Sequence, residues 1–397
     1  MTFPSRTLLA AAVLLAPLTL ATPTASATAP CTSSVPYVSG EGGYDTYRIP
    51  AALTTRRGTL LAFAEGRHNG AGDSGAIDVV LRRSTDDGCT WGPLQVVTAG
   101  NGDTRGNPAP VIDPHTGDIV LVTSYNSGQV TEAQIMRGEV TPEQGRRVFV
   151  QRGRDDGRRF SAPHEITGEV RRPGWRWYAT GPGHAVALTR GPHAGRLVVP
   201  ADHSSAPPAG SPDTGQEGRY YGGHALYSDD GGNRWHLGFV DDSYDGTANA
   251  NETSAAELPD GRLYFSARDQ GGSTGGNRLD SYSSDGGTTL DRPYTAQHTL
   301  DEAPAVAASV LQLRSPAAPL LFSAPSIPTA RRAMAIWRST DKGTTFTKTL
   351  TLSPHPAAYS DLVQLPHASA ALLYETGTKN PYETIEFSHL TGEQLGE

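Results

Sequence analysis

The sequence is poor in sulfur, in aromatic residues and in long apolar runs. Its 397 residues include 2 cysteines, 3 methionines and only 7% aromatic residues. The cysteine spacing offers no metal cluster, and the 12 histidines show no metal-ligand spacing, so the sequence predicts no metal site. A formal charge of −8 argues against a nucleic-acid partner. An anionic small ligand stays compatible with this charge, because a pocket is governed by the charges that line it.

The longest apolar run lies close to the N-terminus and is too short to span a bilayer. It covers residues 8–21 (LLAAAVLLAPLTLA), follows Arg6 and precedes an Ala-Ser-Ala motif at 25–27. This pattern predicts a signal peptide over 1–27 that is cleaved after the small residues, rather than a membrane anchor. We therefore expect a secreted protein with a single domain over 28–397 and no membrane insertion of the mature chain.

The two cysteines, Cys31 and Cys89, could pair in an oxidising compartment. The bond would close a loop of 58 residues, and it would contribute roughly 4 kcal/mol to stability in the chain-entropy model. The distance between two thiols does not follow from their positions in the sequence, so two free thiols are the alternative.

A short motif of the form Ser-x-Asp-x-Gly-x-x-aromatic recurs in a chain that has 45 glycines, 30 prolines and few long helical patterns. That composition predicts an all-β protein. In each motif the Asp can accept backbone N–H bonds, the Gly takes a positive φ and the aromatic residue packs beneath, which describes a β-turn. The copies, two of them imperfect, are STDDGCTW (84–91), GRDDGRRF (153–160), SDDGGNRW (228–235), SSDGGTTL (283–290) and STDKGTTF (339–346).

We interpret this motif as scaffolding rather than as a catalytic feature. Each copy follows a strand-like run, such as IDVVLRRS or YGGHALYS, so it should form a hairpin tip that joins two strands of one blade. Radial repetition of four-stranded antiparallel sheets is a β-propeller. With roughly 60 residues per repeat, the chain is predicted to form six blades.

Several ionisable residues interrupt the strands near their ends, where a propeller opens its central pocket. The segment YDTYRIPAAL (44–53) alternates like a strand, yet Arg48 stands within it and needs an anion from the protein or from a ligand. Any one such residue is explained by solvation or local pairing, but together they predict one site. The set comprises Arg48, Asp73, Glu252, Arg268, Arg332, Tyr359 and Glu375.

At these residues the sequence resembles the bacterial secreted sialidases, which are retaining glycoside hydrolases with Asp-box repeats. The matching segments are YRIPAAL, AFAEGR, NETSAAEL, SARD and AYSDL, spread over essentially the whole mature chain. The resemblance implies an exo-α-sialidase that releases terminal sialic acids from glycoproteins, glycolipids and oligosaccharides without a cofactor, and we expect a monomer. Trans-sialidase or intramolecular trans-sialidase chemistry and a non-catalytic carbohydrate-binding propeller are the alternatives.

The resemblance implies that three arginines bind the carboxylate of sialic acid. Arg48, Arg268 and Arg332 match them, and Arg331 is the competing choice for the third place. The register to Ser339 favours Arg332. Three guanidinium groups suit this task because each can form bidentate, charge-assisted hydrogen bonds to a carboxylate.

The resemblance also assigns the reacting groups. Tyr359 matches the nucleophile, Glu252 rather than Glu257 matches its base, Asp73 matches the acid on a Gly-rich loop, and Glu375 matches the carboxylate that orients the first arginine. A neutral phenol avoids the repulsion that a carboxylate nucleophile would meet beside the carboxylate of the sugar. Sialidases accordingly use a tyrosine where most retaining glycosidases use Asp or Glu, and the predicted stereochemical outcome is retention.

Two further matches and three aromatic residues complete the predicted site. Arg67 matches a residue near the 4-hydroxyl of the sugar, and Asn107 stands where many bacterial members have Asp. Trp175, Trp177 and Tyr178 could form pocket walls, although core packing is the favoured interpretation of these three.

Overall fold

The computed structural model describes residues 1–4, 31–314, 318–365 and 369–395. Contacts divide the chain into two units, Met1–Pro30 and Cys31–Glu397, and every assigned helix and strand lies in the second unit. Most of the predicted signal peptide therefore falls outside the described residues. None of the helices in the described ranges has the length and apolar character needed to cross a membrane.

The second unit is built mainly from strands, and its helices are short. They are α1 (Glu132–Arg137), α2 (Thr167–Val170), α3 (Gly392–Leu395), η1 (Gly191–His193), η2 (Gly218–Tyr220) and η3 (His298–Leu300). The predicted all-β class is confirmed, and the sheets are arranged as a β-propeller.

Four sheets of the described chain form separate blades of four or five strands. One contains β11 (Trp175–Thr180), β12 (Val186–Ala187), β13 (Leu197–Ser205), β14 (Tyr221–Ser228) and β15 (His236–Val240). The next contains β16 (Ala250–Glu257), β17 (Leu263–Asp269), β18 (Arg278–Ser283) and β19 (Thr295–Ala296). The third contains β20 (Ser309–Gln312), β21 (Leu320–Ile327), β22 (Ala330–Ser339) and β23 (Thr347–Thr351). The fourth contains β24 (Ala357–Gln364), β25 (Ala370–Thr376), β26 (Thr384–Leu390) and β1 (Ser33–Val38).

The predicted count of six separate blades is wrong, because the other nine strands form one continuous sheet and leave four separate blades. This sheet contains β2 (Thr46–Thr54), β3 (Leu60–Arg67), β4 (Ile77–Ser84), β5 (Gln95–Thr98), β6 (Thr104–Ile112), β7 (Ile119–Asn126), β8 (Arg147–Arg154), β9 (Arg159–Phe160) and β10 (His164–Glu165). The continuity comes from a parallel pair between β4 and β6, Ile77 with Thr104, where the Ile77 amide donates to the Asp103 carbonyl at 3.1 Å. A motif count cannot reveal such a bridge.

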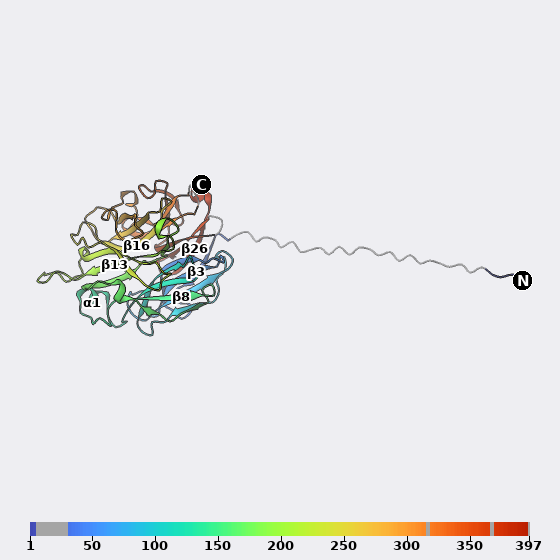
Figure 1. Ribbon diagram of the computed structural model, residues 1–397, viewed down its shortest axis with the longest axis horizontal. Helices are drawn as coiled ribbons and strands as arrows, with labels where there is room; N and C mark the ends of the chain where they lie inside the picture. The colour runs from blue at the N-terminus through green and yellow to red at the C-terminus, as the bar shows by residue number, and fades with distance from the viewer. Residues whose placement is uncertain (5–30, 315–317, 366–368, 396–397) are drawn as a thin grey trace. The chain divides into compact units, whose positions relative to one another are not determined.

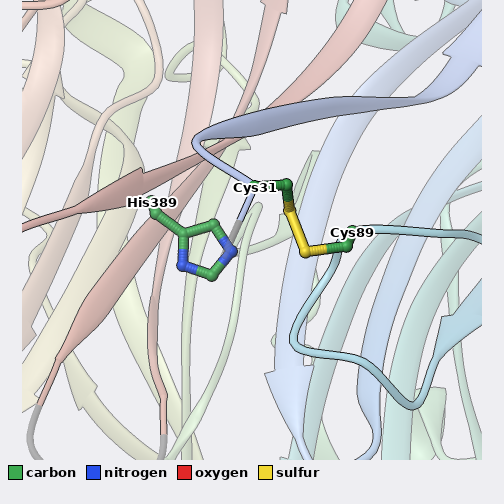
Figure 2. A group of neighbouring side chains, drawn as sticks. All are labelled: Cys31, Cys89 and His389. Carbon is green, nitrogen blue, oxygen red and sulfur yellow. A yellow bond between two sulfur atoms is a disulfide. The ribbon is translucent and has the colours of Figure 1, made fainter. Parts of the chain in front are cut away.

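The two ends of the second unit meet in one blade. Strand β1 pairs antiparallel with β26, and strands β3, β8, β13, β16 and β26 follow one another around this unit (Figure 1). Cys31, directly before β1, forms a disulfide with Cys89 across a sequence separation of 58, so the pairing that the sequence left open is made. The His389 ring lies beside this bond (Figure 2), with its ligand atom and both sulfurs within 4.8 Å of one another.

The recurring motifs lie between the outer strands of their blades, as predicted. Between β18 and β19, Ser283 Oγ donates to Asp285 Oδ1 and accepts from the Gly287 amide, both at 2.9 Å. The Asp285 carboxylate also accepts from the Thr289 amide at 2.9 Å. The same serine bonds recur at Ser84, Ser228 and Ser339. We call the ends of the blades that carry these turns the Asp-box end.

At the other end of the blades the inner strands are irregular. Bulges or register shifts interrupt five of them, between Arg48 and Ala51, Gly106 and Ala109, Trp175 and Tyr178, Ala250 and Thr253, and Ala357 and Ser360. Three non-glycine residues near this end take left-handed backbone angles: Ile49 (φ 57°), Asn107 (φ 51°) and Ala333 (φ 62°). Bulges re-aim side chains and gather beside binding sites. We call this the pocket end.

Candidate active site

A cavity of about 240 Å³ opens at the pocket end. Seven of the nine residues that the sequence predicts for the site line it: Arg48, Arg67, Asp73, Asn107, Glu252, Arg268 and Tyr359. Glu375 lies directly behind the wall of the cavity, where it is fully buried. The structure therefore brings together residues from β2, β3, β6, β16, β17, β24 and β25, which are far apart in the sequence.

Glu375 of β25 holds the side chain of Arg48, which belongs to β2. Arg48 Nε donates to Glu375 Oε1 at 2.8 Å, and the amide of Ile49 donates to the same oxygen at 2.8 Å. The other carboxylate oxygen of Glu375 accepts from the Tyr359 amide at 3.1 Å. Arg48 and Glu375 are 4% and 0% exposed, so the pair is shielded from water and its geometry is fixed. The bulge after Arg48 thus serves to turn one amide toward the carboxylate.

The phenol of Tyr359 lies against a carboxylate that is itself paired with an arginine. Tyr359 Oη donates to Glu252 Oε1, and Arg268 Nη1 donates to Glu252 Oε2 at 3.0 Å. Burial raises the pKa of Tyr359 well above its usual value, and Glu252 raises it further, while Arg268, Arg48 and Arg331 act in the opposite direction. The phenol therefore keeps its proton in the ligand-free pocket, with an acceptor already in place.

The predicted carboxylate-binding set needs a third arginine beside Arg48 and Arg268. Arg331 is the one that lines the cavity, so the prediction of Arg332 is wrong. Arg331 lines the cavity, its Cζ lies 5.5 Å from the centre of the Tyr359 ring, and its Nη1 donates to Tyr382 Oη at 2.8 Å. Arg332 is exposed, and its Nε and Nη2 donate to the Pro354 carbonyl at 3.3 and 3.0 Å.

The error has a local cause in the backbone. A register carried from Ser339 back to Arg332 assumes a regular strand, but Ala333 has a φ of 62°, and the register with β21 shifts between Pro325 and Ile327. A left-handed residue in the strand reverses which neighbour faces the cavity.

Asp73 stands at the rim of the cavity between two arginines. Its Oδ1 accepts from Arg67 Nη1 at 2.9 Å and lies 4.0 Å from Arg48 Nη1, while 60% of its side chain is exposed. Partial removal from water alone would raise the pKa of Asp73, but Arg67 and Arg48 outweigh this and hold the pKa below its usual value. A ligand carboxylate bound to Arg48 would weaken that depression, so Asp73 would take up a proton more readily.

Glu65 is a residue of the site that the sequence argument missed. Its Oε2 accepts from Arg67 Nε at 3.0 Å and from Arg67 Nη2 at 2.6 Å, and its Oε1 accepts from the Asn107 amide at 2.8 Å. The left-handed backbone of Asn107 turns this amide toward the carboxylate. A charged residue inside the apolar run AFAEGR was the available signal, and the run places Glu65 two residues before Arg67 on the same strand face.

Further unpredicted residues line the cavity, and they come from α1, from the position before β8, from β13 and from β14. They are Glu132, Arg146, Asp202 and Tyr221. Of the three candidate aromatic residues, Trp175 and Tyr178 belong to one buried core cluster, and Trp177 belongs to another while it also lines the cavity. The favoured core-packing interpretation therefore holds for all three, and Trp177 is a cavity wall as well.

Taken together, the cavity offers five arginines, a phenol with a proton acceptor, and a carboxyl group at the rim. Arg48, Arg268 and Arg331 can bind an anionic group, the Tyr359–Glu252 pair can supply an oxygen nucleophile, and Asp73 can exchange a proton with a leaving group.

Comparison with known proteins places the chain among repeat-containing families. A family model described as "BNR repeat-like domain" matches residues 58–372. The chain is 32% identical over 368 residues to a sialidase of Micromonospora viridifaciens, covering 89% of this chain and 54% of the relative. It is 27% identical over 361 residues to a sialidase of Bacteroides fragilis, covering 85% of this chain and 61% of the relative. The chain thus spans little more than half the length of these curated relatives.

Among solved structures, the chain resembles the Hadza microbial sialidase Hz136. The two share 26% sequence identity with a TM-score of 0.75, and the match covers 89% of this chain and 67% of that one.

Proposed function

The chain belongs to the BNR repeat-like domain family, and from this premise we propose that it is an exo-α-sialidase that hydrolyses terminal α-linked sialic acids of glycoproteins, glycolipids and oligosaccharides. One observation carries the proposal: three arginines, Arg48, Arg268 and Arg331, border the same cavity as the hydrogen-bonded pair of Tyr359 and Glu252. Sialic acid carries its carboxylate on the anomeric carbon, so a single bound anion places the reacting centre beside the phenol.

In the first step the arginines hold the sugar carboxylate while Tyr359 Oη attacks the anomeric carbon. Forming a phenolate from an ordinary tyrosine at pH 7 costs about 4 kcal/mol. Transfer of the phenol proton to Glu252 Oε1 during the attack avoids a free phenolate, and the nearby guanidinium groups stabilise the charge that develops. The bond from the anomeric carbon to the leaving oxygen breaks, and Asp73 gives that oxygen its proton.

In the second step the covalent tyrosyl sugar is hydrolysed. Asp73, now ionised, takes a proton from water as the water oxygen attacks the anomeric carbon. The bond to Tyr359 breaks, and the phenol recovers its proton from Glu252. Two displacements at the same carbon give retention of configuration.

We also propose that the nine-stranded sheet works as two halves that are joined at one point. The support is the pairing pattern: β2 to β5 and β6 to β10 are antiparallel sets, and the parallel pair of Ile77 with Thr104 links them. Each set also has its own recurring turn between outer strands.

Secretion of the mature chain as a monomer is part of the same proposal. The apolar run at 8–21 with its small-residue motif supports export. The disulfide of Cys31 with Cys89 is consistent with an oxidising compartment.

Proton NMR of the purified protein with sialyllactose tests the function. We expect free sialic acid and lactose, with the α-anomer appearing before mutarotation. A first-formed β-anomer would contradict the covalent mechanism, an anhydro sugar or a newly sialylated acceptor would replace hydrolysis by transfer, and unchanged sialyllactose would contradict the proposed function.

A further inference from the structure

The ring of His389, on β26, lies beside the disulfide of Cys31 with Cys89 and is not fully hydrogen-bonded. Its Nε2 is a buried atom that has no hydrogen-bond partner among the described residues. Figure 2 shows one ring nitrogen turned toward the disulfide, and a ring nitrogen and the two sulfurs lie within 4.8 Å of one another. Buried polar atoms are rarely left unpaired. Here the unpaired nitrogen stands beside two potential metal ligands.

Hydrogen bonds that do not involve sulfur hold these three residues together. The amide of His389 donates to the carbonyl of Thr32, the residue after the first cysteine, at 3.0 Å. The hydroxyl of Ser34 donates to the carbonyl of Gly88, the residue before the second cysteine. Opening of the disulfide therefore leaves both thiols and the imidazole as neighbours.

The backbone and the ring on either side of the disulfide are also fixed locally. In the turn that carries Cys89, Ser84 Oγ accepts from the Gly88 amide at 2.8 Å. The ring of His389 packs edge-on against Phe387, with 5.3 Å between the ring centres. The two cysteines and the histidine are all half-buried, so a small reductant or a metal ion can reach them from solvent.

Two thiolates and one imidazole are a typical ligand set for zinc. Zn²⁺ binds sulfur at about 2.3 Å and imidazole nitrogen at about 2.0–2.1 Å in a tetrahedron, so its ligand atoms lie roughly 3.5–3.8 Å apart. The three ligand atoms here are already within 4.8 Å of one another, and only the two sulfurs have to move apart from bonding distance. Water can take the fourth position.

We propose that Cys31, Cys89 and His389 form a redox-gated metal site that binds one Zn²⁺ ion when the disulfide is reduced. A phosphine supplies the two electrons that break the S–S bond. It is oxidised to its oxide with the oxygen of one water molecule, and the two protons of that water go to the two sulfurs. A dithiol supplies the same electrons and becomes a disulfide itself. Zn²⁺ then displaces the two thiol protons into solution and is bound by both thiolates and by His389 Nε2.

The bound ion would replace the covalent bond as the link between three segments of the chain. These segments are the residues before β1, the recurring turn at 84–91 and strand β26. Because each ligand comes from a different segment, the spacing of cysteine and histidine in the sequence could not reveal the site. The proposal does not depend on the proposed function, and no measurement below uses catalytic activity.

Metal retention is the first test. Cys31 and Cys89 are the only cysteines of the chain, so a thiolate-bound ion can lie only at this place. The protein is reduced with a phosphine, mixed with Zn²⁺ and gel-filtered without oxygen. We expect one Zn²⁺ per reduced chain and none per oxidised chain, and Cd²⁺ in its place should give sulfur-to-metal charge-transfer absorption. A reduced chain without metal, or a disulfide that stays closed under the phosphine, would overturn the proposal.

Thermal unfolding shows whether the ion links the three segments. Reduction should lower the Tm by roughly 5 °C, because the cross-link that closes a long loop is lost. One equivalent of Zn²⁺ should restore at least about half of this decrease, because an ion that binds only the folded chain stabilises it. Mg²⁺ prefers oxygen ligands and should restore nothing. A Tm that does not respond to Zn²⁺ would contradict the link.

His389→Leu is the matched variant, because it keeps both thiols and an apolar contact with Phe387. Competition with a chromophoric chelator should show that the Kd of the reduced chain for Zn²⁺ rises by at least about tenfold. His164→Leu, at an exposed histidine of β10, should leave this Kd unchanged. The oxidised His389→Leu protein should keep its Tm within about 2 °C of wild type; if it does not, His389→Gln takes its place. Equal affinity in wild type and in the folded variant would overturn the site.

Discussion

Polar groups at the two ends of the blades find their hydrogen-bond partners over different distances in the sequence. At the Asp-box end the same Ser-to-Asp and Gly-to-Ser bonds recur, for example at Ser84 and Ser283, within a few residues of sequence. At the pocket end the bonds differ from one another, and two central ones are long-range: Arg48 with Glu375 spans 327 positions, and Tyr359 with Glu252 spans 107.

A turn can satisfy its polar groups with its own short-range hydrogen bonds. The bonds at the pocket end form only when neighbouring blades are both in place. A short-range bond forms in any blade regardless of its neighbours, so the Asp-box end stabilises each blade separately. The long-range pairs need two blades in place, and they fix side chains that a small-molecule site must hold rigidly. We therefore expect substitutions at the pocket end to change chemistry more than stability, and the reverse at the Asp-box end.

The largest expected effect is on turnover. Tyr359→Phe removes the proposed nucleophile, and we expect kcat on an aryl sialoside to fall by about 10³ or more. The Tm should change little, because the ring still packs. Tyr37→Phe is the control: its hydroxyl donates to the Ala62 carbonyl at 2.7 Å in the core, so that variant should lose stability and keep its activity. Retained turnover in Tyr359→Phe would remove the assignment.

A substitution midway along an inner strand should instead affect the fold. Asp361 is fully buried and accepts from the Ala52 amide at 2.8 Å, from the His184 amide and Nδ1 at 2.9 and 2.8 Å, and from Ser309 Oγ at 2.8 Å. Asp361→Asn presents a donor to these donors, and we expect a loss of about 3 kcal/mol in the free energy of unfolding. Urea titration measures it, and a loss below about 1 kcal/mol would contradict the role.

The next effect separates two adjacent arginines. Arg331→Ala should raise KM about 10²-fold, since one charge-assisted contact to the substrate carboxylate is lost. Arg332→Ala should leave KM within about twofold, because Arg332 is exposed and bonded to the Pro354 carbonyl. Michaelis–Menten kinetics with the same aryl sialoside gives KM for both variants. A large rise in KM for Arg332→Ala together with no rise for Arg331→Ala would support Arg332 as the third arginine.

A smaller effect is expected at the Asp-box end. Asp285→Ala removes the acceptor of the Ser283 hydroxyl and of the Thr289 amide. We expect a loss of about 1 kcal/mol in the free energy of unfolding with unchanged kcat and KM. A large loss of activity in a folded Asp285→Ala variant would contradict the division between the two ends.

The smallest effect is a pH dependence of stability at His184. Burial alone would lower the pKa of His184, but its pairing with Asp361 outweighs burial and raises the pKa above the usual value. The stabilisation is therefore complete below the unfolded pKa of about 6.5 and is lost as the pH rises through the folded pKa. The stability difference between wild type and His184→Gln, measured by urea titration, should shrink as the pH increases above 6.5. A difference that grows over this range would contradict the pairing.

Local patterns in the sequence predicted the all-β class and the recurring turns. The turns at 84–91 and 283–290 could be recognised because their bonds are short-range. The third arginine was assigned to Arg332 from the register to Ser339, which passes through Ala333, and the left-handed backbone of Ala333 cannot be inferred from the residue type. The blade count failed at the parallel pair of Ile77 with Thr104.

Residues that act through distant partners were the hardest to predict. Glu65 and Asp361 each stand in an apolar stretch, but nothing local says which blade supplies a partner. The seven residues that do line the cavity were found through family segments such as YRIPAAL and AYSDL, which record long-range pairing that periodicity alone does not contain.

Strand β1 is synthesised long before the strand with which it pairs. It must remain without its partner until β26 has been synthesised, and the same blade carries Tyr359 and Glu375 on β24 and β25. Assembly of the pocket therefore cannot be completed before β26 has been synthesised. A nascent or C-terminally shortened chain that lacks β26 should hold folded middle blades, but it should not hold a working site.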